Sequence, residues 1–411
     1  METLPPDKNS ERGMPMLLSP TPPVHAPKDP AADPPTAGRA RELAGRVAWP
    51  STAERDAGRR WDEDLFTELT RAPRGPGLTG PLIPVELGGD GLSASEAFAL
   101  LEGCAEGSRD PGLTLAVVTH AVLAVVPLRA FGTPEQRERY LPRMASGEWP
   151  GALSLTQTQG AARTPAVRAR PGGPGQPGWV LSGELGLVAG GPRAHHFLVV
   201  AAHEDGGRTA FVVDRSTPGL RLREERPAAM RTCAWSRLVM DDCPVPKDAV
   251  LGTPGGAPGE VEPLLAALDW VFCGAPWLGV MRALVRDAIR TAGERDVFGS
   301  PLTHSQTSRF ALADLATRCE LAEGLLRRAA ARFDAGGRPS LPEAAAARLF
   351  VTSAARDAAV TAARLAGPLT ARGDRLIERT HRDALFFSAT GGGPEVLQPV
   401  VAAHLLALGQ G

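Results

Sequence analysis

The feature that most constrains this fold is a change of periodicity along the chain, from helical to strand-like and back to helical. Between Ala152 and Leu251, short β-type runs are bounded by Gly, Pro, Asp or Ser, which predicts a sheet domain, a barrel or a sandwich. These runs are residues 179–181, 197–200, 210–213, 220–222 and 236–240. The flanking segments carry apolar residues at helical spacing. We therefore expect a helical domain, a β domain and a helical bundle.

The expected boundaries follow from these changes in pattern. Residues 1–40 are rich in proline and poor in large apolar residues, so we expect a disordered tail. Residues 41–149 form the N-terminal helical domain, residues 150–255 the β domain and residues 256–411 the bundle. Within these units, two pairs of residues mark helix starts: Ser93 with Glu96 as a capping box, and Thr133 with Pro134. The long bundle helices are expected at 263–295, 305–334 and 341–365.

A run of three glycines followed by a proline lies close to the C-terminus. Gly391, Gly392 and Gly393 cannot continue a helix, because glycine costs about 1 kcal/mol in a helix interior. Pro394 is suited to the first position of a final helix. This turn lets the backbone approach a neighbour closely and offers no side chain that accepts a proton.

Composition excludes several classes of function. The 411 residues carry a formal net charge of -1 and no basic stripe, which argues against a nucleic-acid partner. The apolar runs fall short of the roughly 20 residues of a membrane span, and no secretory signal is recognisable, so we expect a cytoplasmic protein without a membrane span. The five cysteines are widely spaced and predict buried thiols and no metal site. The excess of arginine over lysine is typical of a high-GC, for example actinobacterial, genome.

Several local stretches, in order, resemble the acyl-CoA dehydrogenase family. The resemblance runs from about Trp61 to the C-terminus. It is most specific at residues 131–142 (FGTPEQRERYLP) and 145–149 (ASGEW), and continues at 212–219 (VVDRSTPG), at Glu294-Arg295 with Phe298-Gly299 and Gln306, and at 382–384 (RDA).

This resemblance implies an α+β multidomain fold with an N-terminal α-helical domain, a central β-barrel-like domain and a C-terminal four-helix bundle. It implies homodimers or tetramers, or hetero-oligomers with a related dehydrogenase. Members usually bind FAD between the β domain and the bundles of two subunits. A glutamate takes the α proton of an acyl thioester while the flavin takes the β hydride, and such a positioned base contributes roughly 10²–10⁴-fold.

The sequence departs from the family at both known positions of this base. Alignment from Arg382 places Gly391 where the glutamate of a Tyr-Glu-Gly-Thr turn is expected. The alternative position, on the first bundle helix, is occupied by Val271, and Phe272 replaces the following arginine. Asp269 matches a structural aspartate of the family rather than a base. We therefore expect ordinary α,β-dehydrogenation to be lost or weakened, and the catalytic residues stay unknown.

The flavin motifs are also altered. In the loop 155–163, Thr156 is retained but the family's serine and aspartate are missing. Leu187 and Ala189 replace a tryptophan and a threonine that meet the flavin ring, and residues 363–367 have lost the glutamine that holds the ADP end. If FAD binds, the resemblance assigns its retained contacts to four residues: Thr156, Arg295, Phe298 and Gln306.

Three functions remain open from the sequence. The first is an enzyme that acts on an acyl thioester, carried by CoA or a carrier protein, in a specialised biosynthetic pathway. Apolar residues beside the Gly391 turn, namely Leu187, Val271 and Phe272, predict a roomier, drier cavity for a bulky acyl chain. The second is a non-catalytic partner subunit of a heteromeric acyl-CoA dehydrogenase. The third is an FAD-dependent dehydrogenase or monooxygenase with a relocated base.

Overall fold

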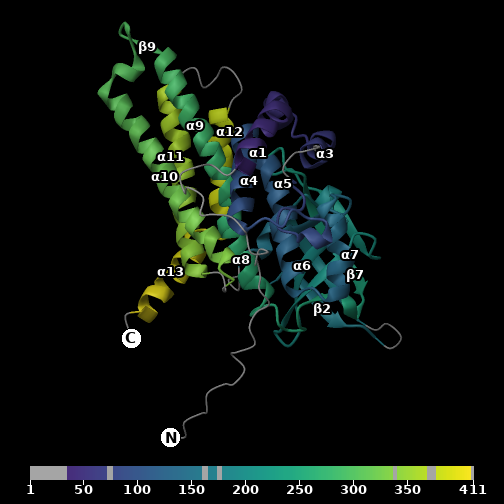
Figure 1. Cartoon of the computed structure of the whole chain (residues 1–411). Helices are drawn as coiled ribbons and strands as arrows, with labels where there is room; N and C mark the ends of the chain where they lie inside the picture. Colours follow the sequence, from purple (N-terminus) through teal and green to yellow (C-terminus); the bar gives the residue numbers. More distant parts are fainter. Residues whose placement is uncertain are drawn as a thin grey trace, which may run out of the picture.

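The predicted order of a helical domain, a β domain and a helical bundle is confirmed (Figure 1). The structure is a computed structural model that describes residues 35–71, 77–159, 165–173, 178–336, 340–367 and 376–408. The first helix begins at Pro35, so the predicted end of the tail at residue 40 lies inside a helix. Residues 1–34 of that predicted tail lie outside the described residues.

The N-terminal domain is built from short helices whose starts carry the predicted caps. Ser93 and Glu96 exchange both hydrogen bonds of a capping box, and Thr133 does the same with Gln136. A π-helical segment, η3 (Thr119–Ala124), interrupts the apolar helical stretch Pro111–Phe131. The helices are α1 (Pro35–Val47), α2 (Thr52–Ala57), α3 (Glu63–Arg71), α4 (Ala94–Ser108), α5 (Pro111–Val118), α6 (Val125–Phe131) and α7 (Pro134–Ala145).

Two helical segments, Pro111–Phe131 and Val261–Glu294, are long and apolar enough to cross a bilayer by length and composition alone. The apolar window of each is completely buried inside the fold. Helices at the centre of a large protein core have the same composition, because they are surrounded by other protein elements. Both segments therefore serve here as core helices.

The β domain is one sheet in which the strands follow the order β6-β7-β3-β1-β4-β5-β8, while β2 pairs with both β3 and β4. The five predicted runs lie within β3 to β7, whereas β1, β2 and β8 were not predicted. The strands are β1 (Gly151–Ser154), β2 (Val167–Pro171), β3 (Trp179–Ala189), β4 (His196–Ala202), β5 (Arg208–Asp214), β6 (Leu220–Glu224), β7 (Trp235–Val245) and β8 (Val250–Leu251).

In the bundle, the predicted helix 263–295 is two helices that meet at Cys273, and the other long helices are close to their predicted bounds. A small hairpin at the far end of α9 and α10 projects away from the β domain (Figure 1). The elements are α8 (Val261–Phe272), α9 (Gly274–Glu294), β9 (Asp296–Val297), β10 (Ser300–Pro301), α10 (Gln306–Asp334), α11 (Leu341–Ala366), α12 (Leu376–Ala389) and α13 (Pro394–Leu408).

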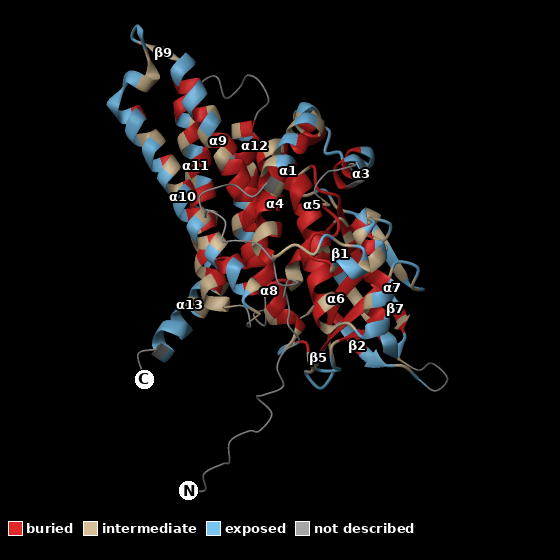
Figure 2. Cartoon of the chain, in the orientation of Figure 1, coloured by how far each residue is buried: buried red, intermediate tan, exposed pale blue. Residues whose placement is uncertain are grey.

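One hydrophobic core joins the N-terminal domain to the bundle, and a smaller one lies within the sheet. Figure 2 shows the buried residues gathered along α4, α5 and α8, whereas much of α10 is exposed. Helix α4 packs against α9, which fixes the helical domain on the bundle. The five cysteines are buried and free, as expected. The turn after α12 consequently faces the place where all three units meet.

Candidate functional site

The Gly391 turn is the centre of the candidate site. Helix α12 ends at Ala389, and α13 begins at Pro394 as predicted. Gly391 has φ 70° and Gly392 has φ 90°, values that L side chains rarely adopt. The carbonyl oxygen of Gly391 accepts a hydrogen bond of 2.6 Å from the buried indole Nε1 of Trp270 on α8. Glycine is therefore required here by the backbone conformation.

Two buried charged side chains lie directly beneath this turn. A Cβ atom on Gly391 would lie 2.4 Å from Oδ2 of Asp269 and 3.1 Å from Nη2 of Arg348. Asp269 also accepts a hydrogen bond of 2.8 Å from Oγ1 of Thr158. Real Cβ atoms do not approach an oxygen so closely. Asp269 therefore fills the space that the side chain of the expected glutamate would enter.

Arg348 on α11 ties the end of α12 to the bundle. Its Nη2 donates to the carbonyl oxygens of Thr390, at 2.9 Å, and Phe387, at 3.1 Å. Its Nε and Nη1 are buried without a hydrogen-bond partner among the described residues. Burial lowers the pKa of the Arg348 guanidinium, and the nearby Asp269 carboxylate opposes this effect. The Asp269 carboxylate therefore offsets part of the cost of burying the Arg348 charge.

The alternative base position lies in the apolar core. Val271 and Phe272 on α8 are completely buried. The Phe272 ring packs against Phe98 of α4, with 6.2 Å between ring centroids, and against Phe333 of α10, with 5.6 Å. A carboxylate at Val271 would have to be completely buried in the apolar core, at a large desolvation cost. This position serves packing in the present chain.

The cavity beside the Gly391 turn is small and partly polar, so the expectation of a roomier, drier cavity is wrong. Its volume is about 10 Å³, and Asp269 and Arg348 contribute to its wall. Trp277 of α9 stacks on Phe387 of α12 with 4.9 Å between ring centroids, and Met230 closes another side. A space of this size holds about one water molecule. As it stands, the cavity does not accommodate an acyl chain.

Thr156, the retained residue of the flavin loop, uses its polar groups within its own turn. Its backbone N–H donates to Oγ of Ser154 at 3.2 Å, and the two hydroxyl groups are 2.7 Å apart. The following residues 160–163, where the sequence lacks the family's serine and aspartate, lie outside the described residues.

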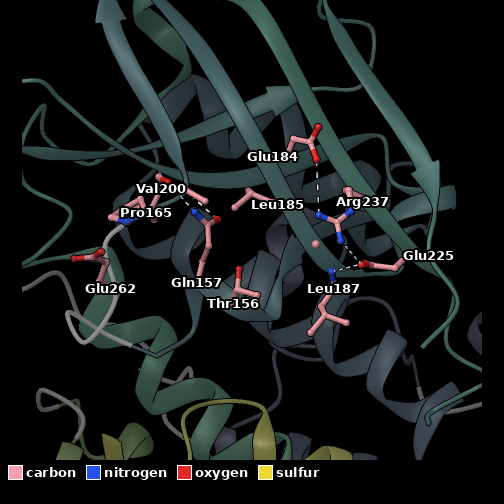
Figure 3. Close-up of a pocket in the computed structure, with 12 residues that line it drawn as sticks. Thr156, Gln157, Pro165, Glu184, Leu185, Leu187, Val200, Glu225, Arg237 and Glu262 are labelled. Carbon is pink, nitrogen blue, oxygen red and sulfur yellow. Dashed lines mark hydrogen bonds and ion pairs between the residues drawn. The ribbon is translucent and has the colours of Figure 1, made fainter. Parts of the chain in front are cut away.

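Figure 3 shows the pocket between this loop and strand β3, which has a volume of about 300 Å³. The backbone N–H of Leu187 donates to Oε2 of Glu225 at 2.6 Å, and Glu225 also accepts from Arg237 at 2.8 Å. The backbone of Leu187 has φ 50°, and its N–H is bound to the Glu225 carboxylate in this conformation. Among the residues that the structure describes, the pocket wall includes three carboxylates, from Glu184, Glu225 and Glu262, and one guanidinium, from Arg237.

These residues do not fit FAD in their present arrangement. The cofactor carries a negatively charged diphosphate and a ring rich in hydrogen-bond acceptors, so it requires free donors or cations. The N–H groups of Thr156 and Leu187 are already engaged, and the Arg237 guanidinium is already paired with Glu184 and Glu225. FAD binding would require Glu225 to leave Leu187.

The other residues assigned to FAD gather at the projecting hairpin and not beside Thr156. Arg295 donates through Nη1 to the carbonyl oxygen of Leu365 at 2.8 Å, so it is held against the end of α11. Phe298 is fully exposed at φ 54°, and Gln306 is exposed at the start of α10. Phe298 and Gln306 are therefore available to another molecule, whereas Arg295 is engaged within the chain.

The histidine pair offers no metal site. The ring of His195 stacks on Trp149 at 3.8 Å between centroids, while His196 is buried in strand β4. Among the described residues, no group of three His, Cys, Asp or Glu side chains is arranged to hold a metal ion. Both rings pack on aromatic neighbours, His195 on Trp149 and His196 on Tyr140.

Sequence reasoning assigned Asp269 a structural role, and it missed Arg348 and Glu225. A signal was present for Arg348, because it lies on the buried face of an alanine-rich helix. Charged residues in such positions are almost always paired. Glu225, in the loop after β6, gave no comparable signal.

Comparison with known proteins agrees with this architecture along nearly the whole chain. Three family models match in order: the acyl-CoA dehydrogenase N-terminal domain at residues 36–148, the middle domain at 152–243 and the C-terminal domain at 271–406. The human mitochondrial short-chain specific acyl-CoA dehydrogenase is 30% identical over 374 residues, which cover 89% of this chain and 88% of that protein. Benzylmalonyl-CoA dehydrogenase of Aromatoleum aromaticum is 31% identical over 366 residues, covering 88% and 94%.

Solved structures show the same fold. Butyryl-CoA dehydrogenase from Megasphaera elsdenii superposes with a TM-score of 0.84 and 25% identity, covering 93% of this chain and 100% of that one. A prolyl acyl carrier protein oxidase gives a TM-score of 0.81 and 25% identity, covering 91% and 100%. With every domain matched in order and relatives at 30% identity over most of its length, the chain belongs to the acyl-CoA dehydrogenase family.

Proposed function

We propose that this chain is a non-catalytic member of its family and works as the partner subunit of a competent acyl-CoA dehydrogenase. The observation that carries the proposal is the filling of its own acyl site by Asp269, Trp277 and Phe387. Neither base position carries a carboxylate, since Gly391 and Val271 occupy them. An α proton on a thioester is a weak acid, so losing the base removes a large part of the rate.

The exposed hairpin supports a role toward a second subunit. Phe298 is fully exposed, and Ile289, Phe310 and Leu321 on α9 and α10 are more than half exposed. Large apolar side chains gathered on one projecting part of a soluble protein mark an interaction site. The resemblance to the family assigns the corresponding residues Phe298 and Gln306 to a neighbouring subunit's flavin, which is the role we propose for them here.

Purification of the chain alone and together with a related, catalytically complete dehydrogenase tests this proposal. We expect the chain alone to lack absorbance near 450 nm and to leave butyryl-CoA unchanged, whereas a mixed complex contains FAD and is active. Phe298→Ser is expected to weaken the mixed complex. Leu385→Ser, at an exposed leucine on α12, serves as the matched control. Stoichiometric FAD in the lone chain, with bleaching by butyryl-CoA, would refute the proposal.

A second candidate is an enzyme that acts on an acyl thioester without a redox step, in a specialised biosynthetic pathway. The observation that favours it is the Asp269 carboxylate in the cavity wall beside Gly391. Once the cavity opens far enough to admit the thioester, Asp269 would take a proton from its α carbon, leaving an enolate, and return it to the same carbon. The fold of the prolyl acyl carrier protein oxidase makes a carrier-bound thioester a reasonable substrate.

Exchange of α protons in D₂O separates the two candidates, because it needs no electron acceptor. The second candidate predicts deuterium in the α position of butyryl-CoA or a butyryl-pantetheine thioester, measured by mass spectrometry. Asp269→Asn would abolish this exchange, while Thr158→Val, which removes only the hydrogen-bond donor to Asp269, would retain it. No exchange with the native chain leaves the partner-subunit proposal as the one supported.

A further inference from the structure

A separate cavity lies where the N-terminal domain meets the β domain. This junction pocket, with a volume of about 130 Å³, is lined by the turn between α2 and α3 and by the loop between β6 and β7. Its wall includes Arg59, Trp61, Arg226, Arg231 and Trp235. The pocket shares Glu225 with the pocket of Figure 3, but none of the acyl-cavity residues. Neither proposed function uses it.

Two guanidinium groups in this wall have no carboxylate partner among the described residues. Arg59 reaches only the carbonyl oxygens of Arg226 and Pro227, at 3.4 and 3.5 Å. Arg231 donates through Nε to the carbonyl oxygen of Ala228 at 2.9 Å. A guanidinium has five N–H donors, so both side chains keep several donors for another molecule.

The carboxylates of the same wall are already neutralised. Glu224 accepts from Nε of Arg226 at 2.7 Å. Glu225 is bound by Arg237 at 2.8 Å and by the N–H of Leu187 at 2.6 Å. The charges of Arg59 and Arg231 are therefore left over, and the pocket is a cationic site despite its two glutamates.

We propose that the junction pocket binds the phosphate group of a phosphorylated ligand. Guanidinium groups recognise phosphate through paired N–H donors, and phosphate offers enough acceptor oxygens for Arg59 and Arg231 together. A volume of about 130 Å³ admits a phosphate and a few attached atoms but not a dinucleotide. The phosphate arrives either free or as the end of an organic ester.

Titration of the full chain with inorganic phosphate at constant ionic strength tests the site. Trp61 and Trp235 lie in the wall, so binding is followed by tryptophan fluorescence and by the rise of the thermal unfolding midpoint. We expect saturable binding that Arg59→Gln and Arg231→Gln each weaken at least about tenfold. Phosphopantetheine is titrated in parallel, and tighter binding of either probe identifies the source of the phosphate.

Arg223→Gln is the matched control, because Arg223 is an exposed arginine of the adjacent strand β6 whose side chain does not line the pocket. This variant is expected to bind phosphate like the native chain. Three results would overturn the proposal: a response that never saturates, equal binding of acetate, or equal weakening by Arg223→Gln. Arg59 and Arg223 are exposed, so neither variant is expected to impair folding.

Discussion

Oδ2 of Asp269 lies 2.4 Å from the position that a Cβ atom on Gly391 would occupy. These residues are far apart in sequence, on α8 and in the turn after α12, yet the fold brings one carboxylate to the place where the side chain of another is expected. Asp269 therefore occupies the space beside Gly391, and the absence of the glutamate leaves no open cavity there.

Gly391→Ala is expected to destabilise the chain more than a positive φ alone explains. The φ of 70° costs about 1–2 kcal/mol for a non-glycine residue, and the contact with Asp269 adds about 1–3 kcal/mol of overpacking. Gly190→Ala is the control, since Gly190 has φ 73° and nothing within 4 Å of its Cβ position. Urea unfolding measures both changes. Equal losses of unfolding free energy at the two glycines would contradict the observed packing.

Gly391→Glu should not restore dehydrogenation, because Asp269 occupies the space that the new side chain would enter.

Asp269→Asn is expected to lower the free energy of unfolding by about 1–3 kcal/mol, because it removes the carboxylate that offsets the burial of the Arg348 guanidinium. Thr158→Val, which removes one neutral donor to Asp269, should cost about 1 kcal/mol. Addition of Arg348→Met to Asp269→Asn should recover part of the loss. Strictly additive effects in this double-mutant cycle would show that the two charges do not interact.

Trp277→Ala should reopen the acyl cavity. Removing the indole leaves an apolar space beside Phe387 and Met230 at a cost of about 3–5 kcal/mol in unfolding free energy. We expect the variant, unlike the native chain, to bind benzene or a butyryl-pantetheine thioester, measured by NMR or calorimetry. Trp149→Ala, at an indole that stacks on His195 outside this cavity, is the control. Failure of Trp277→Ala to bind either probe would show that other side chains close the site.

His196 should make the chain sensitive to acid. Burial, reinforced by positive neighbours, lowers its pKa from 6.5 to about 3, so the native state keeps the ring neutral. Between pH 6.5 and 3 the unfolded chain binds a proton that the folded chain does not, and the free energy of unfolding therefore falls as the pH falls. The slope reaches about 1.4 kcal/mol per pH unit for this histidine.

His196→Phe tests this pH dependence at little structural cost, since the ring packs on Tyr140 and its Nδ1 has no hydrogen-bond partner among described residues. Urea unfolding at pH 7, 6 and 5 should show a shallower decline for the variant. The exposed His404, changed to Phe, should leave the decline unchanged. An identical decline in all three proteins would assign the acid sensitivity to other groups, of which the buried His120 is the nearest alternative.

Local signals were enough to predict most of the fold. The capping boxes at Ser93 and Thr133 depend on residues three positions apart, and the start of α13 at Pro394 depends on the backbone of proline itself. Strands β1 and β2 escaped prediction because each is short. Strand β1 is buried along its whole length and shows no alternation, and β2 alternates over only five residues that end in a proline. The break at Cys273 was also missed, since both flanking helices are apolar.

The sequence by itself determined the family, the order of the domains and the absence of a carboxylate at Gly391 and Val271, because these depend on residue identity and local spacing. Only the tertiary structure decided what occupies the site. Asp269, Trp277 and Phe387 come from three helices, and their contacts depend on how those helices pack. A sequence shows which side chain is missing at a position, but the shape of the space at that position depends on how all the surrounding elements pack.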